Sequence, residues 1–244
     1  MSIQALVEMI RESDNIVFFG GAGTSTESNI PDFRSEEGLY QAKQKYKYSP
    51  ETMLSHTFFK RNTEEFYRFY KESMIYKNAM PNDGHKALVD LEKLGKLKAV
   101  ITQNIDGLHQ LAGNKEVLEL HGSIHRNYCT KCKEFYDLNS ILNSKEVIPT
   151  CKKCGSIIKP DVTLYEEALK NEILSKAVNY ISEADMLIVA GTSLVVYPAA
   201  GLINYYKGNK LVLINKQVTP YDSKANLVIN DSIGKILKNV VLTL

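Results

Sequence analysis

Four short runs along this chain are apolar on both faces, and stretches with helical periodicity lie between them. The runs are Ile16–Phe19, Ala99–Thr102, Met186–Ala190 and Leu211–Ile214, and a fifth candidate strand is Leu227–Ile229. Parallel strands covered by helices on both sides have this composition. The stretches predicted as helices are Ile3–Glu12, Glu64–Met74, Gly84–Leu94, Leu169–Ser182, Ala199–Tyr206 and Ile233–Val240. The alternation predicts an α/β fold with a doubly wound parallel sheet.

The four cysteines form two C-x-x-C pairs, Cys129 with Cys132 and Cys151 with Cys154. Their separation falls in the window of about 15–20 residues that is typical of structural zinc sites. Gly155 follows the second pair, where such a turn needs a positive φ. Two redox dithiols or two disulfides are less favoured, because no cysteine follows a strand at a helix start and the compartment is expected to be reducing. We therefore predict one structural zinc ion with a closed shell of four thiolates.

Two segments interrupt the alternation of strands and helices. Residues 32–80 are rich in Tyr, Phe, Ser and Lys, and we predict a cofactor-binding loop followed by a helical insertion. Residues 121–159 hold the cysteine pairs and form the predicted zinc-binding module, inserted into the α/β domain. The remaining residues, 1–31, 81–120 and 160–244, make up the predicted Rossmann-like nucleotide-binding domain.

Charge and hydropathy exclude several classes of function. The 30 basic and 28 acidic side chains leave a formal charge of only +2, without a basic tail, so we expect no direct nucleic-acid partner. No apolar run approaches the roughly 18 residues of a membrane span, and the mixed charges at the N-terminus are unlike a secretory signal. The sequence thus predicts a cytoplasmic protein without a membrane partner.

A glycine-rich loop, Gly20 to Ser25, follows the first predicted strand directly. Such a loop lets backbone N–H groups approach a phosphate, and the dipole of the following helix adds to the attraction. The dinucleotide fingerprint is incomplete, because Thr26 stands at its third glycine position, and the lysine of a Walker loop is missing. A glycine-rich turn without catalytic interest therefore stays open on this motif alone.

Polar residues also follow two other predicted strands. The segment from Gln103 to His109 follows one strand, and Gly191-Thr192-Ser193 follows another. Ligands of open α/β sheets bind where parallel strands end. The alternative is that Asn104 and Asp106 are helix caps. Capping could explain each residue by itself, but it poorly explains why all these polar residues lie at strand ends.

The combined motifs resemble the sirtuin family. They occur in the family's order and cover nearly the whole chain: Gly21-Ala22-Gly23-x-Ser25, Ile30-Pro31-Asp32-Phe33-Arg34, Thr102-Gln103-Asn104-Ile105-Asp106, His121-Gly122, the cysteine pairs, Lys159-Pro160-Asp161-Val162, Gly191-Thr192-Ser193 and Asn215. Little of the chain lies outside them, so we expect a minimal, prokaryote-type member. The resemblance implies an NAD-dependent protein-lysine deacetylase that releases nicotinamide and O-acetyl-ADP-ribose.

The resemblance also implies roles for individual residues. His121 is the expected general base and acts with Asn104, since a neutral imidazole that titrates near ~6.5 suits proton removal at neutral pH. The other histidines, His56, His85, His109 and His125, are expected to be structural. The implied NAD-binding residues are Ala22, Gly23, Thr26, Asp32, Phe33, Arg34, Gln103, Asn104, Ile105, Asp106, His121, Gly191, Thr192, Ser193, Asn215, Lys216, Asp231 and Ser232. The implied partner is an acetyl-lysine peptide added as a strand against Val162, Leu164, Tyr165, Val195 and Val196.

Two departures from the family bear on selectivity. Glu166 replaces a glycine beside the expected peptide groove and adds a negative charge there. The branch of the family that accepts longer, acidic acyl groups carries the motif Tyr-x-x-Arg. Here Tyr67 matches the tyrosine of this motif, and Tyr70 stands at the position of its arginine. A buried succinyl carboxylate without a guanidinium partner would be costly, so a short neutral acyl group is expected.

Three other functions remain open on the sequence. A mono-ADP-ribosyltransferase would use the same NAD cleavage, and a zinc-ribbon interaction module would keep only a vestigial nucleotide fold. His121 argues against the first as the main activity, and Asn104, Asp106 and His121 argue against the second. A dehydrogenase is disfavoured further, because no acidic residue follows a second strand at the usual ~20-residue spacing. The sequence does not determine the oligomeric state, and a monomer is favoured.

Overall fold

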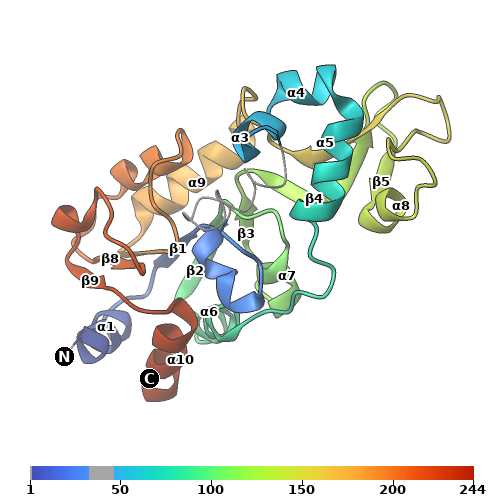
Figure 1. Cartoon of the computed structure of the whole chain (residues 1–244). Helices are drawn as coiled ribbons and strands as arrows, with labels where there is room; N and C mark the ends of the chain where they lie inside the picture. The colour runs from blue at the N-terminus through green and yellow to red at the C-terminus, as the bar shows by residue number, and fades with distance from the viewer. Residues whose placement is uncertain (1, 33–46) are drawn as a thin grey trace.

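A six-stranded parallel sheet forms the centre of the protein. The computed structural model describes residues 2–32 and 47–244. The strand order is β3-β2-β1-β7-β8-β9 (Figure 1), with bounds β1 Ile16–Gly20, β2 Leu97–Thr102, β3 Val117–Glu119, β7 Met186–Ala190, β8 Leu211–Ile214 and β9 Leu227–Ile229. All five predicted strands are confirmed, and β3 is an addition that the sequence analysis did not include.

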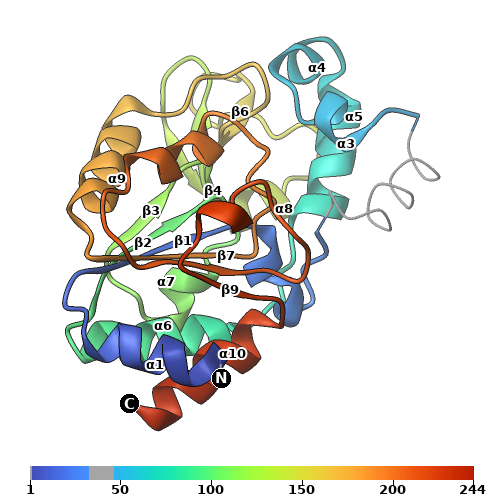
Figure 2. The same cartoon turned by 90° about the vertical axis from the view of Figure 1, so that its left-hand side faces the viewer.

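Helices cover both faces of this sheet, as the strand composition predicts. In strand β1, Phe18 packs into one hydrophobic core, whereas Val17 and Phe19 pack into the other. The face of Phe18 is covered by α1 (Ser2–Arg11), α6 (Asp83–Lys93) and α10 (Ile233–Thr243). The opposite face is covered by α9 (Asn171–Glu183) and the 3-10 helix η4 (Ala199–Tyr205), and Figure 2 shows the two layers. The doubly wound architecture is therefore confirmed.

Two predicted helices differ in type from the expectation. The stretch predicted from residue 64 to residue 74 is an α-helix, α5 (Thr63–Phe69), that continues into the π-helical turn η3 (Tyr70–Met74). The helix predicted at Ala199–Tyr206 is η4, whose Gly201 N–H donates to the carbonyl of Pro198 at 3.0 Å, an i→i+3 bond. Periodicity alone does not separate these tighter and wider turns from an α-helix.

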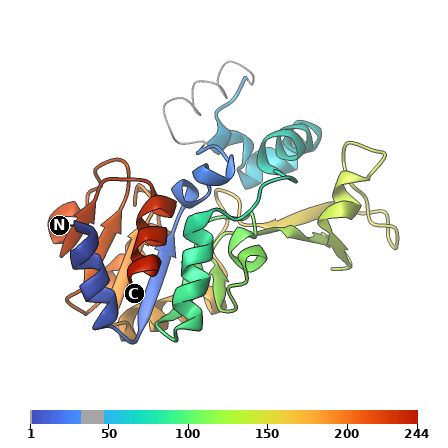
Figure 3. The same cartoon turned by 90° about the horizontal axis from the view of Figure 1, so that it is seen from below.

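A smaller antiparallel sheet projects from the α/β unit (Figure 3). Its strand order is β5-β4-β6, with β4 Gly122–Cys129, β5 Phe135–Asp137 and β6 Ile158–Val162, and helix α8 (Leu138–Leu142) packs on β4. Helices α3 (Pro50–Met53), α4 (His56–Arg61) and α5 share a hydrophobic core with this sheet, through Phe66, Ile124 and Val162 among others. The helical insertion and the cysteine-bearing sheet thus pack as one body, and the domain limits given above stay a prediction.

The remaining short elements are α7 (Leu108–Ala112), η1 (Ala22–Thr24), η2 (Thr26–Ser28) and η5 (Asp222–Lys224). Within the described residues, no helix combines the length and the apolar character that crossing a membrane requires.

Candidate active site

Side chains link the carboxyl ends of strands β2, β7 and β8 at one edge of the central sheet. Gln103 follows β2 and donates from Nε2 to the hydroxyl of Thr192, which follows β7, at 3.0 Å. The backbone N–H of Thr192 donates to Oδ1 of Asn215, which follows β8, at 2.9 Å. The polar residues at predicted strand ends therefore meet in space, as expected for the ligand edge of an open sheet.

The glycine-rich loop after β1 packs directly against the end of β7. A Cβ atom on Gly21 would lie 2.8 Å from the carbonyl oxygen of Gly191, and one on Gly23 would lie 2.7 Å from the Gly191 Cα. Backbone on both sides leaves no room for a side chain at either position. Thr26, at the third fingerprint position, donates from its hydroxyl to the carbonyl of Gly23 at 3.0 Å and closes the turn.

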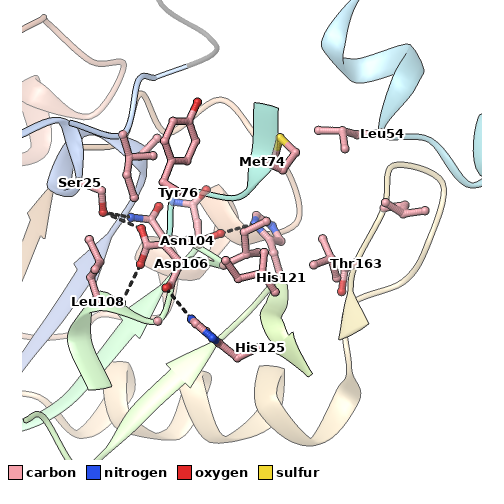
Figure 4. Close-up of a pocket in the computed structure, with 18 of the residues that line it drawn as sticks. Ser25, Leu54, Met74, Tyr76, Asn104, Asp106, Leu108, His121, His125 and Thr163 are labelled. Carbon is pink, nitrogen blue, oxygen red and sulfur yellow. Dashed lines mark hydrogen bonds between the residues drawn. The ribbon is translucent and has the colours of Figure 1, made fainter. Parts of the chain in front are cut away.

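A cavity of about 950 Å³ opens beside this edge, between the parallel sheet and the smaller sheet (Figure 4). Its wall includes eleven of the predicted site residues, namely Ala22, Asp32, Gln103, Asn104, Ile105, Asp106, His121, Val162, Leu164, Tyr165 and Val196. Apolar side chains from the helical insertion and the smaller sheet complete the wall, among them Leu54, Met74 and Ile124. Among the described lining residues, Lys77 is the only lysine or arginine.

A chain of hydrogen bonds fixes the two polar residues at the centre of the cavity wall. Asn104 donates from Nδ2 to the hydroxyls of Thr24, at 2.9 Å, and Ser25, at 3.0 Å. Ser25 in turn donates to Oδ2 of Asp106 at 2.7 Å, and Oδ1 of Asp106 accepts the N–H of Leu108 at 2.9 Å. Asp106 thus precedes the N-cap residue Gly107, accepts the first N–H of α7 and also lines the cavity, so a role at the helix start and a role in binding are compatible in this residue.

His121 lies on the same wall, immediately before β4 (Figure 4). Its Nδ1 is 2.9 Å from the carbonyl oxygen of Gln103. Because a carbonyl oxygen only accepts, Nδ1 carries the hydrogen, and Nε2 is the basic nitrogen of the neutral ring. Gly122 has a φ of 78°, and a Cβ there would lie 1.8 Å from the carbonyl oxygen of Asp161, so only glycine fits beside His121.

Two buried histidines, His85 and His109, pack against each other with ring centroids 4.6 Å apart and ring planes tilted by 56°. Burial lowers the pKa of His85 to about 4, against the opposing effect of the Asp106 charge. Burial also lowers the pKa of His109 well below its usual value, and the neighbouring His85 adds to this. Both rings are therefore neutral at physiological pH, which agrees with the expectation that they are structural.

The four cysteines converge in the smaller sheet. Their Sγ atoms all lie within 4.8 Å of one another, and the pairs Cys129–Cys154 and Cys132–Cys151 are 3.4 and 3.5 Å apart. Four thiolates at about 2.3 Å from a tetrahedral zinc ion lie about 3.8 Å apart, so the cluster fits one zinc ion with a closed shell. Gly155 has a φ of 72°, as predicted for the turn after the second pair.

The site also offers one unsatisfied polar group, in Asn215, to a dinucleotide. Nδ2 of Asn215 is buried and has no hydrogen-bond partner among the described residues, although its Oδ1 is engaged by Thr192. A buried amide N–H without a partner is costly, so this group fits a ligand that supplies an acceptor. Together with the glycine loop and the polar cavity wall, Asn215 makes the residues present compatible with NAD.

Other predicted site residues lie outside the cavity wall or outside the described part of the chain. Phe33 and Arg34 belong to the residues that the structure does not describe. Those absent from the wall are Gly23, Thr26, Gly191, Thr192, Ser193, Asn215, Lys216, Asp231, Ser232 and Val195. Asp231 pairs with Lys235 at 2.6 Å and accepts the N–H of Ser232, at the start of α10.

The segment expected to receive a peptide strand is already partly bonded. The N–H groups of Thr163, Leu164 and Tyr165 donate to His121 O, Glu167 Oε2 and Leu54 O, respectively. An added strand would therefore have to pair with other groups of this segment or displace these bonds.

Glu166 and Tyr70, the two departures from the family, are both engaged in the structure. Glu166 adopts a φ of 73° and accepts the N–H of Thr57 at 2.8 Å, so its carboxylate lies on the first turn of α4. Tyr70 is fully buried against Phe66 and Tyr67 and is absent from the described cavity wall. The expected proximity of Tyr70 to the acyl group is therefore not seen.

Sequence analysis did not include three residues in the site. Thr24 and Ser25 connect the glycine loop to Asn104 and Asp106, and their position inside the quoted motif was the available signal. His125, which we expected to be merely structural, lies on the cavity wall and contacts the carbonyl of Asp106.

Comparison with known proteins agrees with this site. The model of the Sir2 family matches residues 21–198. An "NAD-dependent protein deacetylase" of Clostridium tetani is 68% identical over 97% of this chain and 96% of its own length. One of Cutibacterium acnes is 49% identical over 98% of both chains. Solved structures include a Sir2 with a deacetylated p53 peptide and 3'-O-acetyl ADP ribose, with TM-score 0.91 and 38% identity over 100% of this chain and 98% of that one. The chain belongs to the Sir2 family.

Proposed function

We propose that this protein is an NAD-dependent protein-lysine deacetylase that releases nicotinamide and O-acetyl-ADP-ribose. The observation that carries the proposal is the orientation of His121, whose Nδ1–H is held by the Gln103 carbonyl on a wall shared with Asn104 and Asp106. The names of the bacterial relatives support it, as does a Sir2 structure that holds a p53 peptide and NAD+ at 38% identity.

His121 is the proposed general base. Since Gln103 fixes the tautomer, the ring presents Nε2 as the proton acceptor and stays oriented when it becomes charged, because Nδ1–H continues to donate to the same carbonyl. NAD, when bound, supplies the electrophilic ribose carbon and the hydroxyl from which a proton is removed. Asn104 is the proposed partner of His121, as an oriented hydrogen-bonding group on the same wall.

The remaining predicted residues have proposed binding roles. The glycine loop with Ala22, Gly23 and Thr26 would hold the pyrophosphate, and Thr192, Ser193 and Asn215 would hold the adenosine half, with Lys216, Asp231 and Ser232 further along it. Ile105 and Asp106 would bind the nicotinamide carboxamide. Val162, Leu164, Tyr165, Val195 and Val196 would contact the acetyl-lysine peptide.

The cysteine cluster has a proposed structural role. A closed shell of four thiolates leaves no position for a reacting water, so the zinc ion would stabilise the smaller sheet and take no part in the chemistry. Cysteines that bind zinc as thiolates persist in a reducing compartment, which supports the proposed cytoplasmic location. We also propose a monomer.

The proposal is tested by incubating the protein with an acetyl-lysine peptide and NAD. We expect deacetylated peptide, nicotinamide and O-acetyl-ADP-ribose in equal amounts, detected by mass spectrometry. ADP-ribose attached to a protein, with the acetyl group retained on the peptide, would instead indicate the mono-ADP-ribosyltransferase. Binding of neither NAD nor peptide would favour the interaction module.

A further inference from the structure

His125 makes a contact with the candidate site that its expected structural role does not explain. It lies in strand β4, four residues after His121, and its exposed ring forms part of the cavity wall. Its Nε2 is 3.0 Å from the carbonyl oxygen of Asp106 (Figure 4). Because that oxygen only accepts, Nε2 is the donor.

The ring of His125 also packs on the next residue of the loop. Gly107 has a φ of 74°, and a Cβ atom there would lie 2.8 Å from both Cδ2 and Nε2 of His125. The imidazole therefore occupies the space beside the Gly107 Cα. It contacts the peptide group between Asp106 and Gly107 through a hydrogen bond and through packing.

Strand β4 fastens this loop at two consecutive carbonyl groups. The N–H of Ile124 donates to the carbonyl of Ile105 at 3.0 Å, and His125 donates to that of Asp106. The first bond is made by the main chain and is available to any residue at position 124. The second depends on the side chain at position 125, so it is the part of the fastening that this sequence specifies.

The fastened carbonyl belongs to the residue whose carboxylate faces the cavity. The Asp106 carboxylate is held on its other side by Ser25 and by the N–H of Leu108. Rotation of the peptide group between Asp106 and Gly107 would move the start of α7, and with it the Leu108 N–H that orients Oδ1. His125 thus restrains the carboxylate from the backbone side.

We propose that His125 is a positioning residue that holds the Ile105–Asp106 turn in the conformation that binds the nicotinamide carboxamide. The inference rests on the proposed function. It assigns His125 no contact with the reacting atoms, so its loss weakens the binding of NAD and of nicotinamide and leaves the chemical step intact.

The test compares His125→Ala, His125→Leu and His125→Gln. Gln carries a donor the same number of bonds from Cβ as Nε2 of histidine, whereas Leu keeps apolar bulk without a donor. We expect His125→Ala and His125→Leu to raise both the KM for NAD and the inhibition constant of nicotinamide by roughly 2- to 10-fold, which is the usual contribution of one hydrogen bond. The kcat at saturating NAD and the KM for the peptide stay within about twofold. In His125→Gln, the KM for NAD and the inhibition constant of nicotinamide return to the wild-type values.

Each outcome decides between hypotheses. Thermal unfolding of every variant shows whether the fold is kept. If His125→Ala is destabilised, His125→Gln serves as the matched folded control. If the wild type is active and the inhibition constant of nicotinamide is the same for His125→Leu and His125→Gln, the role of the hydrogen bond is overturned. A wild type without NAD-dependent deacetylation overturns the proposed function and this inference together.

Discussion

Mild acid is expected to destabilise this protein through the buried, contacting pair of His85 and His109. His85 accepts the N–H of Asn82 at Nδ1, so its Nε2 carries the hydrogen of the neutral ring, and this Nε2 has no partner among the described residues. Neither nitrogen of His109 has a described partner, and its ring also contacts Phe18. A proton added to either ring would place a charge in a buried site without an acceptor.

The size of the effect follows from linkage. A histidine whose folded pKa is lowered takes up its proton in the unfolded state first, so its stabilisation is complete above the unfolded value of about 6.5 and is lost as the pH falls. With a folded pKa of about 4, His85 lowers the free energy of unfolding by roughly 1 kcal/mol between pH 7.5 and pH 5.5. The pKa of His109 is also lowered well below its usual value, so this residue lowers the free energy of unfolding in the same direction as the pH falls.

The assay is urea unfolding of the zinc-loaded protein at pH 7.5, 6.5 and 5.5. The variant His85→Gln keeps an acceptor for the Asn82 N–H, and His109→Leu fills the buried site with an apolar side chain of similar size. Each variant should lose part of the pH dependence, and the variant with both substitutions should lose more than either. Loss of zinc in acid is common to all variants and cancels in the comparison. If the double variant and the wild type lose the same free energy of unfolding between these pH values, the buried pair is not the cause.

Three further predictions concern the chemistry and the metal. His121→Ala should lower the kcat for deacetylation by a factor on the order of 10²–10⁴ with little change in NAD affinity measured by calorimetry, and near-normal turnover would contradict its role as the base. Metal analysis of protein purified under reducing conditions should find one zinc per chain, and a chelator should remove circular-dichroism signal of the smaller sheet; zinc-free protein with an intact spectrum would exclude the site. Acetyl-lysine peptides should exceed succinyl-lysine peptides by roughly 100-fold in kcat/KM, because the only described cation on the cavity wall is the exposed Lys77, and equal rates would refute this.

The parallel sheet was predictable because its strands are short runs that are apolar on both faces and are bounded by polar residues in the sequence. Strand β3 lacks this signal, since it has only three residues and ends on Glu119. That carboxylate is buried because it pairs with Arg126 at 2.7 Å, and Arg126 belongs to the smaller sheet. A strand stabilised by an ion pair from another sheet cannot be recognised from local hydropathy.

The position of Tyr70 shows a second limit of sequence reasoning. The resemblance to the family placed Tyr70 near the acyl group. Arg68, two residues earlier, lies on the exposed side of the helix and pairs with Glu64 at 2.6 Å. Tyr70, however, begins the π-helical turn and stacks on Phe66 in the core behind the cavity. Which apolar residue of a helix reaches a cavity depends on the packing of neighbouring elements, and this is not encoded in the spacing of one segment.

The direction of the hydrogen bonds at the strand ends explains why Asn104 and Asp106 are not interchangeable. The two hydrogens of the Asn104 amide go to the hydroxyls of Thr24 and Ser25, and these hydroxyls donate onward to the Gly21 carbonyl at 2.7 Å and to Asp106. Since both final groups only accept, every donor in the chain points the same way, and the amide of Asn104 is fixed with Oδ1 as its remaining acceptor. An aspartate at position 104 has no side-chain hydrogen to donate, so its carboxylate would face the oxygen lone pairs of the Thr24 and Ser25 hydroxyls. An asparagine at position 106 would remove the charge that orders the chain. The sequence Gln-Asn-Ile-Asp therefore specifies a directed network, and the order of its polar residues follows from that direction.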